Sequence, residues 1–448
     1  MTTTAGATTV PDIYTPDLYV SGPPHELFAE LRRTQPVFWQ DMPGEPGYWA
    51  VLKHTDVEYV SQHPELFSAE RGGIVLEDLE EERLEALRGT LLSMDPPRHR
   101  AYRKPLVKSF TARVVGGMED RIRTICREIF ARLPIEGGGS AATSNMGGGG
   151  RRVGGSAATS NMGGGGRRVG GNVEFVHDVT SSLPTQVIGE LMGLPQEDWA
   201  YIHRLAERNT SSQDPDVGGT EEDGYGPGAA SMEMAKYAIG FAMQRRSELG
   251  RVEEPREDLT TLILESEFGG KQMTDVDFGM FFVQLVTAGN DTTKTMLSAG
   301  LHALLTHPEQ LAALREDPSL VPGAVEEILR WANPLHYFRR TATQDVELRG
   351  TRIKAGDKVA MYYTSANRDE DVFEDPQRFD IFRRPNPHLS FGFAEHFCLG
   401  VHIARLEGRV FFEELLAAYP RIELTGEPKR LRSNLNNALT KLPVRLIA

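Results

Sequence analysis

Cysteine and long apolar runs are scarce in this chain of 448 residues. It has two cysteines, Cys126 and Cys398. Two cysteines cannot build a framework of several disulfides, so we expect a reduced, cytoplasmic compartment. The most apolar stretch, residues 279–289, is far too short to span a bilayer, and the polar N-terminus lacks the basic flank and apolar core of a signal peptide. We therefore expect no membrane anchor.

Positive charge is also in short supply. The chain has 49 lysines and arginines against 63 aspartates and glutamates, a formal net charge of -14. This balance argues against a nucleic-acid-binding protein, which would present a basic surface. With 40% hydrophobic and 25% charged residues, the composition is that of an ordinary globular protein. The length fits either one large single-core enzyme or two to three smaller domains.

Glycine, in contrast, is dense between residues 137 and 171. The segment 138–153, G-G-S-A-A-T-S-N-M-G-G-G-G-R-R-V, repeats without change at 154–169. Glycine at this density cannot bury enough apolar area to offset its ordering entropy, so we predict a flexible surface insertion. It contains G-x-G-x-x-G matches, as a nucleotide-binding oxidoreductase would. No strand is predicted before them and no G-K-S/T follows, so this alternative is weak.

Apolar spacing and turn residues predict a mostly helical chain. Apolar residues three and four positions apart predict a helix over 118–133, with Cys126 packed in the core beside this stripe. A long helix is predicted from about 274 to 305, with Thr274 as its N-cap and Asp277 three residues later. The remaining predicted elements are helices over 182–195, 308–315, 322–331 and 399–419, a loop over 211–228, and strands of a small antiparallel sheet over 345–353 and 357–363.

The stretch F-G-F-A-E-H-F-C-L-G, residues 391–400, places Cys398 at the predicted start of the last helix. The unpaired N–H groups and partial positive charge of a helix N-terminus stabilise a thiolate. A lone cysteine without a C-x-x-C partner is a poor zinc site, but it suits a single axial bond to heme iron. The alternative is a buried free cysteine at a helix start.

Two further motifs lie on predicted helices. The first, A-G-N-D-T-T at 288–293, puts an acid beside an alcohol inside the long helix, where the pair can relay protons through water. The alternative is a polar cluster in a kinked core helix. The second, E-I-L-R at 327–330, puts Glu327 and Arg330 on one helix face, where they can pair. The alternative there is a solvated surface salt bridge.

Several cations could bind an acidic cofactor. The run Asp95-Pro96-Pro97 is typical of an N-cap followed by proline at the first helical position, after which His99 and Arg103 share one helix face. Pro105 predicts a kink or an early end of that helix. Arg340 enters a strand and His396 precedes Cys398 by two residues. Taken singly, each cation could equally lie at the surface.

Together and in this order, the motifs resemble those of the cytochrome P-450 family, from about Asp17 to the C-terminus, with only the glycine-rich insertion outside the resemblance. The resemblance implies a mainly α fold with a small antiparallel β region (α+β), in a single heme-enclosing domain over 1–448 with the insertion at 137–171. It implies heme b as cofactor, with Cys398 as the metal ligand. The implied heme-binding residues are His99, Arg103, Arg340, His396, Cys398, Phe391, Gly400 and Ala288, and the implied catalytic residues are Asp291 and Thr292.

Two positions qualify the resemblance. In the family a further arginine joins the Glu327–Arg330 pair, and P-Q-R-F supplies Arg378 for it. The family usually has glycine where this chain has Ala394. If that position needs a positive φ, alanine there costs roughly 1 kcal/mol.

The implied activity is that of a heme-thiolate monooxygenase, which inserts one oxygen atom of O2 into a C–H bond. No flavin or iron–sulfur motif lies in the chain, so electrons from NAD(P)H must arrive through a ferredoxin or flavodoxin with its reductase. We expect such a partner to dock near the basic residues Arg98, Arg100, Lys104 and Lys108. A non-catalytic heme-thiolate sensor is the alternative function.

The segments expected to line the substrate pocket are apolar or mixed, which indicates a hydrophobic small molecule. They are 72–91, 280–288, 335–338 and 434–439. The stretches after Arg339 resemble actinobacterial members that hydroxylate methyl-branched lipids, sterols or terpenoids, with a polyketide as an open alternative. We expect a monomer.

Overall fold

The computed structural model describes residues 11–133, 135–136, 169–220, 226–249, 251 and 256–447. Residues 137–168, which hold most of the glycine-rich repeat, lie outside the described residues, so the flexible insertion stays a prediction. The chain on its two sides pairs as the antiparallel strands β4 (Ile135–Glu136) and β5 (Val169–Gly170). The described residues on the two sides of this segment therefore lie side by side.

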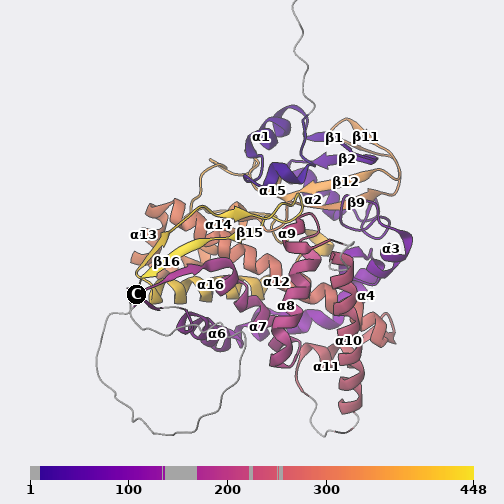
Figure 1. The fold of residues 1–448 in the computed structure, drawn as a ribbon. Helices are drawn as coiled ribbons and strands as arrows, with labels where there is room; N and C mark the ends of the chain where they lie inside the picture. The colour runs from indigo at the N-terminus through magenta and orange to yellow at the C-terminus, as the bar shows by residue number, and fades with distance from the viewer. Residues whose placement is uncertain are drawn as a thin grey trace, which may run out of the picture.

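Helices form the main body, and a smaller sheet region lies at one end of it (Figure 1). The α-helices are α1 (His25–Thr34), α2 (His54–Gln62), α3 (Glu81–Arg88), α4 (Arg98–Val107), α5 (Ala112–Gly116), α6 (Glu119–Ala131), α7 (Ser182–Leu191), α8 (Trp199–Thr210), α9 (Pro215–Gly218), α10 (Pro227–Leu249), α11 (Leu259–Glu265), α12 (Asp275–Thr306), α13 (Pro308–Glu316), α14 (Val321–Ala332), α15 (Tyr363–Ala366) and α16 (Val401–Ala418). The predicted helices are confirmed, whereas the predicted loop over 211–228 also contains the short helix α9.

The longest helix, α12, runs through the middle of the helical body (Figure 1). It begins with a capping box, in which Thr274 Oγ1 accepts the N–H of Asp277 and the Asp277 carboxylate accepts the N–H of Thr274, both at 3.1 Å. Phe282 in its first half packs in an apolar cluster with α8, α10 and α11. Leu301 in its second half packs in another with α6, α14 and α16. Residues 287–295, most of which are polar, lie between these two clusters and are held in place by them.

A glycine sets the close spacing between α12 and its neighbours. A Cβ atom at Gly300 would lie 2.8 Å from Ile328 of α14 and 2.9 Å from Phe412 of α16. Any larger residue would push the helices apart. Gly300 therefore helps to fix the distance between the helix that carries Asp291 and the helix that follows Cys398.

The strands form one five-stranded sheet and several two- or three-stranded ladders. The larger sheet has the order β1-β2-β12-β9-β3, and all of its pairs are antiparallel except the parallel pair β2/β12. The sequence predicted β10, β11 and β12 but missed β1 and β2. The remaining bounds are β1 (Val37–Met42), β2 (Glu45–Val51), β3 (Phe67–Ser68), β6 (Asn172–Glu174), β7 (Glu267–Phe268), β8 (Lys271–Gln272), β9 (Tyr337–Ala342), β10 (Val346–Leu348), β11 (Thr351–Ile353), β12 (Lys358–Tyr362), β13 (Arg421–Leu424), β14 (Lys429–Arg430), β15 (Leu439–Lys441) and β16 (Pro443–Ile447).

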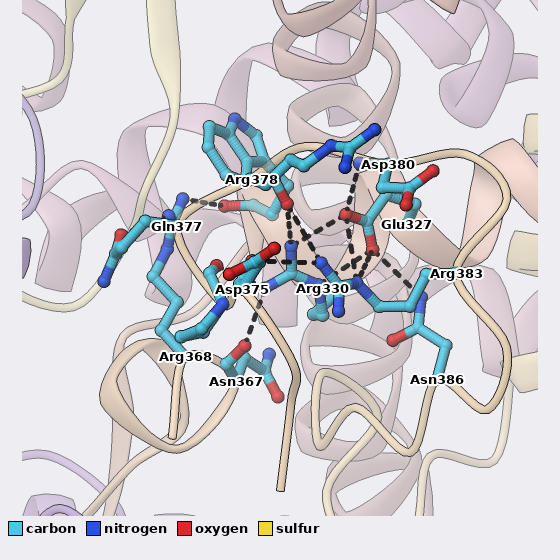
Figure 2. Close-up of polar contacts among 12 residues, drawn as sticks. Glu327, Arg330, Asn367, Arg368, Asp375, Gln377, Arg378, Asp380, Arg383 and Asn386 are labelled. Atoms are coloured by element: carbon cyan, nitrogen blue, oxygen red, sulfur yellow. Dashed lines mark hydrogen bonds and ion pairs between the residues drawn. The ribbon is translucent and has the colours of Figure 1, made fainter. Parts of the chain in front are cut away.

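The pair Glu327–Arg330 on α14 is fully buried rather than solvated. Arg330 Nε and Nη2 donate to the two carboxylate oxygens of Glu327 at 2.8 and 2.7 Å, and both side chains are 0% exposed. The other N–H groups of Arg330 reach the carbonyls of Asn367, Pro376 and Arg378, each at 3.0 Å (Figure 2). This pair therefore ties α14 to the irregular segment that leads to the Cys398 loop.

The predicted third arginine of this cluster is wrong. Arg383, not Arg378, supplies the guanidinium, with its Nε 3.3 Å from Glu327 Oε2 (Figure 2). The Arg378 side chain is exposed and contributes only its carbonyl oxygen. The reason is local: the N–H of Asp380 donates to Glu327 Oε1 at 2.8 Å, and this contact turns the chain so that Arg383 faces the carboxylate.

The two arginines make a matched pair for mutation. We expect Arg383→Met to lower the free energy of unfolding by about 2 kcal/mol, because it removes one cation from a buried carboxylate. Arg378→Met should change it by less than about 0.5 kcal/mol, since an exposed side chain is lost and the carbonyl contacts remain. Urea unfolding of both variants measures the difference. Equal losses in the two variants would contradict the assignment of Arg383.

Candidate functional site

Cys398 lies three residues before α16, in a loop that folds back on itself. The N–H of Cys398 donates to the carbonyl of Phe391 at 2.8 Å, and the N–H of Gly400, the N-cap of α16, bonds to the Cys398 sulfur. The Phe391 ring lies beside the ring of Phe397, at 6.4 Å between centroids, and beneath the guanidinium of Arg405. These contacts fix the position of the sulfur, while the residue as a whole is half-buried.

Opposing effects act on the pKa of the Cys398 thiol. Burial raises the pKa of the thiol, and it outweighs the Gly400 N–H and the guanidinium groups of Arg103 and Arg405, which lower this pKa. The predicted help from the helix N-terminus is present, but it does not by itself produce a thiolate. A metal cation bonded to the sulfur would hold it deprotonated.

Two residues of the same loop adopt left-handed backbone conformations. Gly392 has φ 69° and Ala394 has φ 54°. Glycine adopts such angles freely, whereas the Cβ of alanine is strained there by roughly 1 kcal/mol. The expectation that position 394 requires a positive φ is thus confirmed, and this chain carries the strain.

The structure brings His99, Arg103, Arg340 and His396 together next to this loop. The rings of His99 and His396 lie 4.4 Å apart between centroids, and His99 and Arg340 are almost fully buried. Burial and then the neighbouring arginines lower the pKa of His99 to about 4 and that of His396 well below its ordinary value. The two imidazoles are therefore neutral, whereas the guanidinium groups of Arg103 and Arg340 are positively charged and have too few nearby carboxylates to balance them.

Unpaired polar atoms show what this group can bind. His99 Nδ1 and His396 Nε2 are buried and have no hydrogen-bond partner among the described residues. Glu395 lies 3.8 Å from His99 but is engaged by Arg100, whose Nε donates to it at 2.8 Å. Buried polar atoms need a hydrogen-bond partner, and imidazole N–H groups beside guanidinium groups suit an anionic acceptor. The donor set therefore fits the two carboxylates of a heme, although the role of each residue stays a prediction.

The start of α4 differs from its prediction. α4 begins at Arg98, and no side chain caps it. The Asp95 carboxylate instead accepts the N–H of Ala69 at 2.8 Å and the hydroxyl hydrogen of Ser68. The predicted N-cap is wrong because the end of β3 and the residue after it offer these donors to Asp95 in place of the helix.

The rest of α4 follows the prediction. The helix passes through Pro105 and ends at Val107, so the expected early end is confirmed. His99 and Arg103 still lie one turn apart. The expected docking residues on α4 and just after it are solvent-exposed, and of these Arg100 is paired with Glu395 while Arg98 lies 3.6 Å from Glu70.

The acid–alcohol pair lies at the centre of α12. Asp291 is 8% exposed, and the Thr292 hydroxyl donates to the carbonyl of Ala288 at 2.8 Å. The helix nevertheless continues without a break. The Asp291 carboxylate is held by the hydroxyl of Thr210 from α8 and by Lys294 Nζ, 3.1 Å from Oδ1.

Sequence reasoning missed these two partners of Asp291. Lys294 lies one turn after Asp291 on the same helix, so its position could have been recognised from the spacing. Thr210 and a second acid, Glu207, come from α8, and nothing in the sequence indicates that α8 crosses α12 at this point. Both of these lie beside a cavity of about 190 Å³ that Asp291, Thr292, Asn436 and Leu439 also line.

The four segments expected to line a substrate pocket contact one another in two pairs. The first pair is 72–91 with 280–288, and the second is 335–338 with 434–439. The N–H of Leu91 donates to Gln284 Oε1 at 2.8 Å, which joins the first predicted segment to the second. Leu335 and Asn436 form an isolated antiparallel bridge, which joins the third to the fourth. The structure thus brings these segments together around α12.

Among the described residues, no group of three or more His, Cys, Asp or Glu side chains could hold a metal ion. None of the described helices is long and apolar enough to cross a membrane.

Comparison with known proteins gives consistent results. Residues 228–447 match the family model described as cytochrome P-450. The chain is 34% identical over 426 residues to a steroid C26-monooxygenase of Mycolicibacterium smegmatis, covering 93% of this chain and 89% of that protein. It is 36% identical over 425 residues to a methyl-branched lipid omega-hydroxylase of Mycobacterium tuberculosis, covering 93% and 90%. A Mycobacterium marinum cytochrome P-450 solved with pseudoionone has a TM-score of 0.80 and 33% identity, covering 98% of this chain and 100% of that chain.

The strained residue of the cysteine loop gives a direct test of this geometry. Ala394→Gly should raise the free energy of unfolding by about 0.5–1 kcal/mol and slow heme loss modestly, because glycine removes the left-handed strain. Ala404→Gly, inside α16, is the control and should lower the free energy of unfolding by about 1 kcal/mol. Chemical unfolding and heme transfer to an acceptor globin measure both. A loss of stability in Ala394→Gly would refute the strain.

Proposed function

Because the chain belongs to the cytochrome P-450 family and is a heme-thiolate monooxygenase, we propose that it hydroxylates the methyl-branched end of a lipid or sterol. Its cofactor is heme b and its co-substrate is O2. The observation that carries the substrate proposal is that two sets of relatives, each about a third identical over more than nine-tenths of this chain, are named for attack at such ends. Carbon 26 of a steroid is a terminal methyl of its branched side chain, and an omega carbon ends a lipid chain.

The chain's own residues have distinct roles in holding the heme. We assign Cys398 as the iron ligand, since its backbone N–H is held by the Phe391 carbonyl and its sulfur by the N–H of Gly400. His99, Arg103, Arg340 and His396 would bind the propionates through the donors described above. Ala288, whose side chain is exposed on α12, would contact the cofactor. When bound, the heme supplies the activation of dioxygen and the oxidation of the C–H bond.

Asp291 and Thr292 are the groups that we expect to move protons. A carboxylate next to a hydroxyl can accept a proton from water at one side and donate it at the other. The Thr292 hydroxyl rests on the Ala288 carbonyl, one helical turn back, and is therefore held in a fixed direction. Asp291 and Thr292 both line the polar cavity between the two apolar clusters of α12, and we expect protons to enter from that cavity.

The electrons for the reaction must come from a separate protein. We propose that a ferredoxin or flavodoxin with its reductase brings electrons from NAD(P)H and docks against the exposed cations Arg98, Arg100, Lys104 and Lys108. These residues lie on or next to α4, the helix that also carries Arg103 beside Cys398. The formal net charge of -14 makes such a local basic patch the part of the surface that an acidic partner would prefer. We further propose a cytoplasmic monomer with a single domain over 1–448.

Reconstituted turnover tests the function. With a surrogate ferredoxin and its reductase, the protein should convert a methyl-branched fatty acid or a sterol with a branched side chain into a product hydroxylated at the chain terminus. A straight-chain acid of equal length is the matched control and should be a poorer substrate. Mass spectrometry locates the new hydroxyl group. Heme spectra without NAD(P)H-dependent product from any lipid or sterol would favour the sensor alternative.

Thr292→Ala separates proton supply from binding. The variant should keep the substrate-induced spectral shift of the heme, because the hydroxyl lies on the proton route rather than on a substrate anchor. Product formed per NAD(P)H consumed should fall about tenfold or more, with hydrogen peroxide released instead. Thr293→Ala, one residue further along α12, is the control. If product yield per NAD(P)H is the same in Thr292→Ala as in the unmodified protein, the assignment of Thr292 fails.

A further inference from the structure

Arg430 of β14 carries a guanidinium group that pairs with no carboxylate among the described residues. It donates to Asn437 Oδ1 at 3.0 Å. Burial lowers its pKa, and no acid in the described part of the chain opposes that effect. A Cβ atom at Gly22 would lie 3.6 Å from Arg430 Nε, so this guanidinium packs against the chain just before α1. A partly buried charge whose partner is a neutral amide favours the binding of an anion.

Three histidines lie around Arg430. Burial lowers the pKa of His25, His302 and His336, and the charge of Arg430 lowers each of them further. His336 bonds through Nδ1 to the Thr364 hydroxyl at 2.8 Å, whereas Nδ1 of His25 is buried and has no hydrogen-bond partner among the described residues. The three imidazoles are therefore neutral near pH 7, and His25 has an unused polar atom near Arg430.

Helix α1 brings a deeper guanidinium to the same place. His25 is the first residue of this helix, and no side chain caps its N-terminus, so the positive end of the helix dipole adds to the group. Arg32 lies two turns later on the same face, with 1% of its side chain exposed. Its Nε donates to Glu370 at 2.9 Å and its Nη1 to the Ser365 carbonyl at 3.2 Å, while Nη2 is buried without a partner in the described chain.

A third guanidinium comes from Arg368, two residues after α15. Helices α1 and α15 lie side by side, joined by the contact between Arg32 and Ser365 (Figure 1). The Arg368 guanidinium lies 3.8 Å from the centre of the Trp331 ring, and its charge has the largest effect on the pKa of His25 after burial. Of the described carboxylates, Glu370 alone pairs with any of these three arginines. Positive charge is thus in excess here, although the whole chain is acidic.

We propose that Arg430, His25 and Arg32 form a binding site for a phosphate group at the start of α1. His25 and Arg430 are half-buried whereas Arg32 is almost fully buried, so the site is open to solvent on one side. The several acceptor oxygens of a phosphate suit a guanidinium fork, an imidazole N–H and helix N–H groups together. None of these residues is assigned to the heme, so the site is separate from that of the cofactor.

Two sources can supply this phosphate group, a soluble molecule or a phospholipid headgroup. Apolar side chains are exposed shortly before α1, with Leu18 40% and Val20 46% exposed. Lys429, next to Arg430, is exposed and lies directly opposite the exposed Lys441 in the β14/β15 ladder. Like charges directly opposite each other destabilise a ladder, and an acidic lipid surface would relieve that repulsion. A soluble phosphate would use Arg430 and α1 alone.

Titration of the heme-loaded protein with inorganic phosphate tests the site, at fixed pH and with the ionic strength held constant by chloride. Calorimetry should show one saturable site. Arg430→Met should raise the dissociation constant about tenfold or more, because a charged hydrogen-bond donor is lost. Arg430→Lys keeps the charge without the planar fork, so its dissociation constant should lie between those of Arg430→Met and the unmodified protein. His25→Phe should weaken binding as well.

Arg432→Met is the matched control. Arg432 lies two residues after Arg430 and is paired with Asp17, so its loss should leave the dissociation constant unchanged. Phosphate stabilises folded proteins in general by exclusion from their surface, so the dissociation constant is compared rather than the unfolding temperature. The heme absorbance and the unfolding temperature of each variant show that it has folded.

Vesicles of phosphatidylcholine with and without phosphatidic acid identify the source. A lipid headgroup predicts cosedimentation with the phosphatidic acid vesicles only, which Arg430→Met abolishes and Leu18→Ser weakens. A soluble phosphate predicts saturable binding of inorganic phosphate without cosedimentation. Either result supports the site. Absence of both kinds of binding, equal binding by Arg430→Met and the unmodified protein, or an equal loss in Arg432→Met would overturn the proposal.

Discussion

Burial of the Cys398 sulfur is the constraint on which the rest of the site depends. Burial raises the pKa of this thiol, and the nearby N–H of Gly400 and the guanidinium of Arg103 offset only part of that effect. A bound metal cation would resolve the conflict, because it would favour the deprotonated sulfur directly. The loop is built to keep the sulfur in place, even at the cost of a left-handed alanine at position 394.

Charged groups are buried at other places in the molecule as well, and their partners differ from place to place. At Glu327 the solution is permanent: Arg330 and Arg383 surround one carboxylate and lock the segment that leads to the cysteine loop. At Lys294 one buried ammonium contacts two carboxylates, Asp291 on its own helix and Glu207 on α8. In the group around His99 and Arg340, the buried atoms His99 Nδ1 and His396 Nε2 have no hydrogen-bond partner among the described residues, which is the arrangement expected of a site that receives an anionic cofactor.

Features set by neighbouring residues could be predicted from the sequence, whereas contacts between distant segments could not. The capping box of Thr274 and the helical turn that separates His99 from Arg103 depend on spacing alone. The third arginine of the Glu327 cluster could not be predicted, because a single backbone contact from Asp380 decides which arginine faces the carboxylate. Glu207 reaches Lys294 only because α8 crosses α12, which is a consequence of the whole apolar core.

The absorbance spectrum of the reduced protein with carbon monoxide tests the central claim most directly. A thiolate from Cys398 on the heme iron predicts a strongly red-shifted band, and Cys398→Ala should abolish it while Cys126→Ala leaves it intact, since Cys126 is buried in the core beside α16. Survival of the red-shifted band in Cys398→Ala, or its loss in Cys126→Ala alone, would contradict the account.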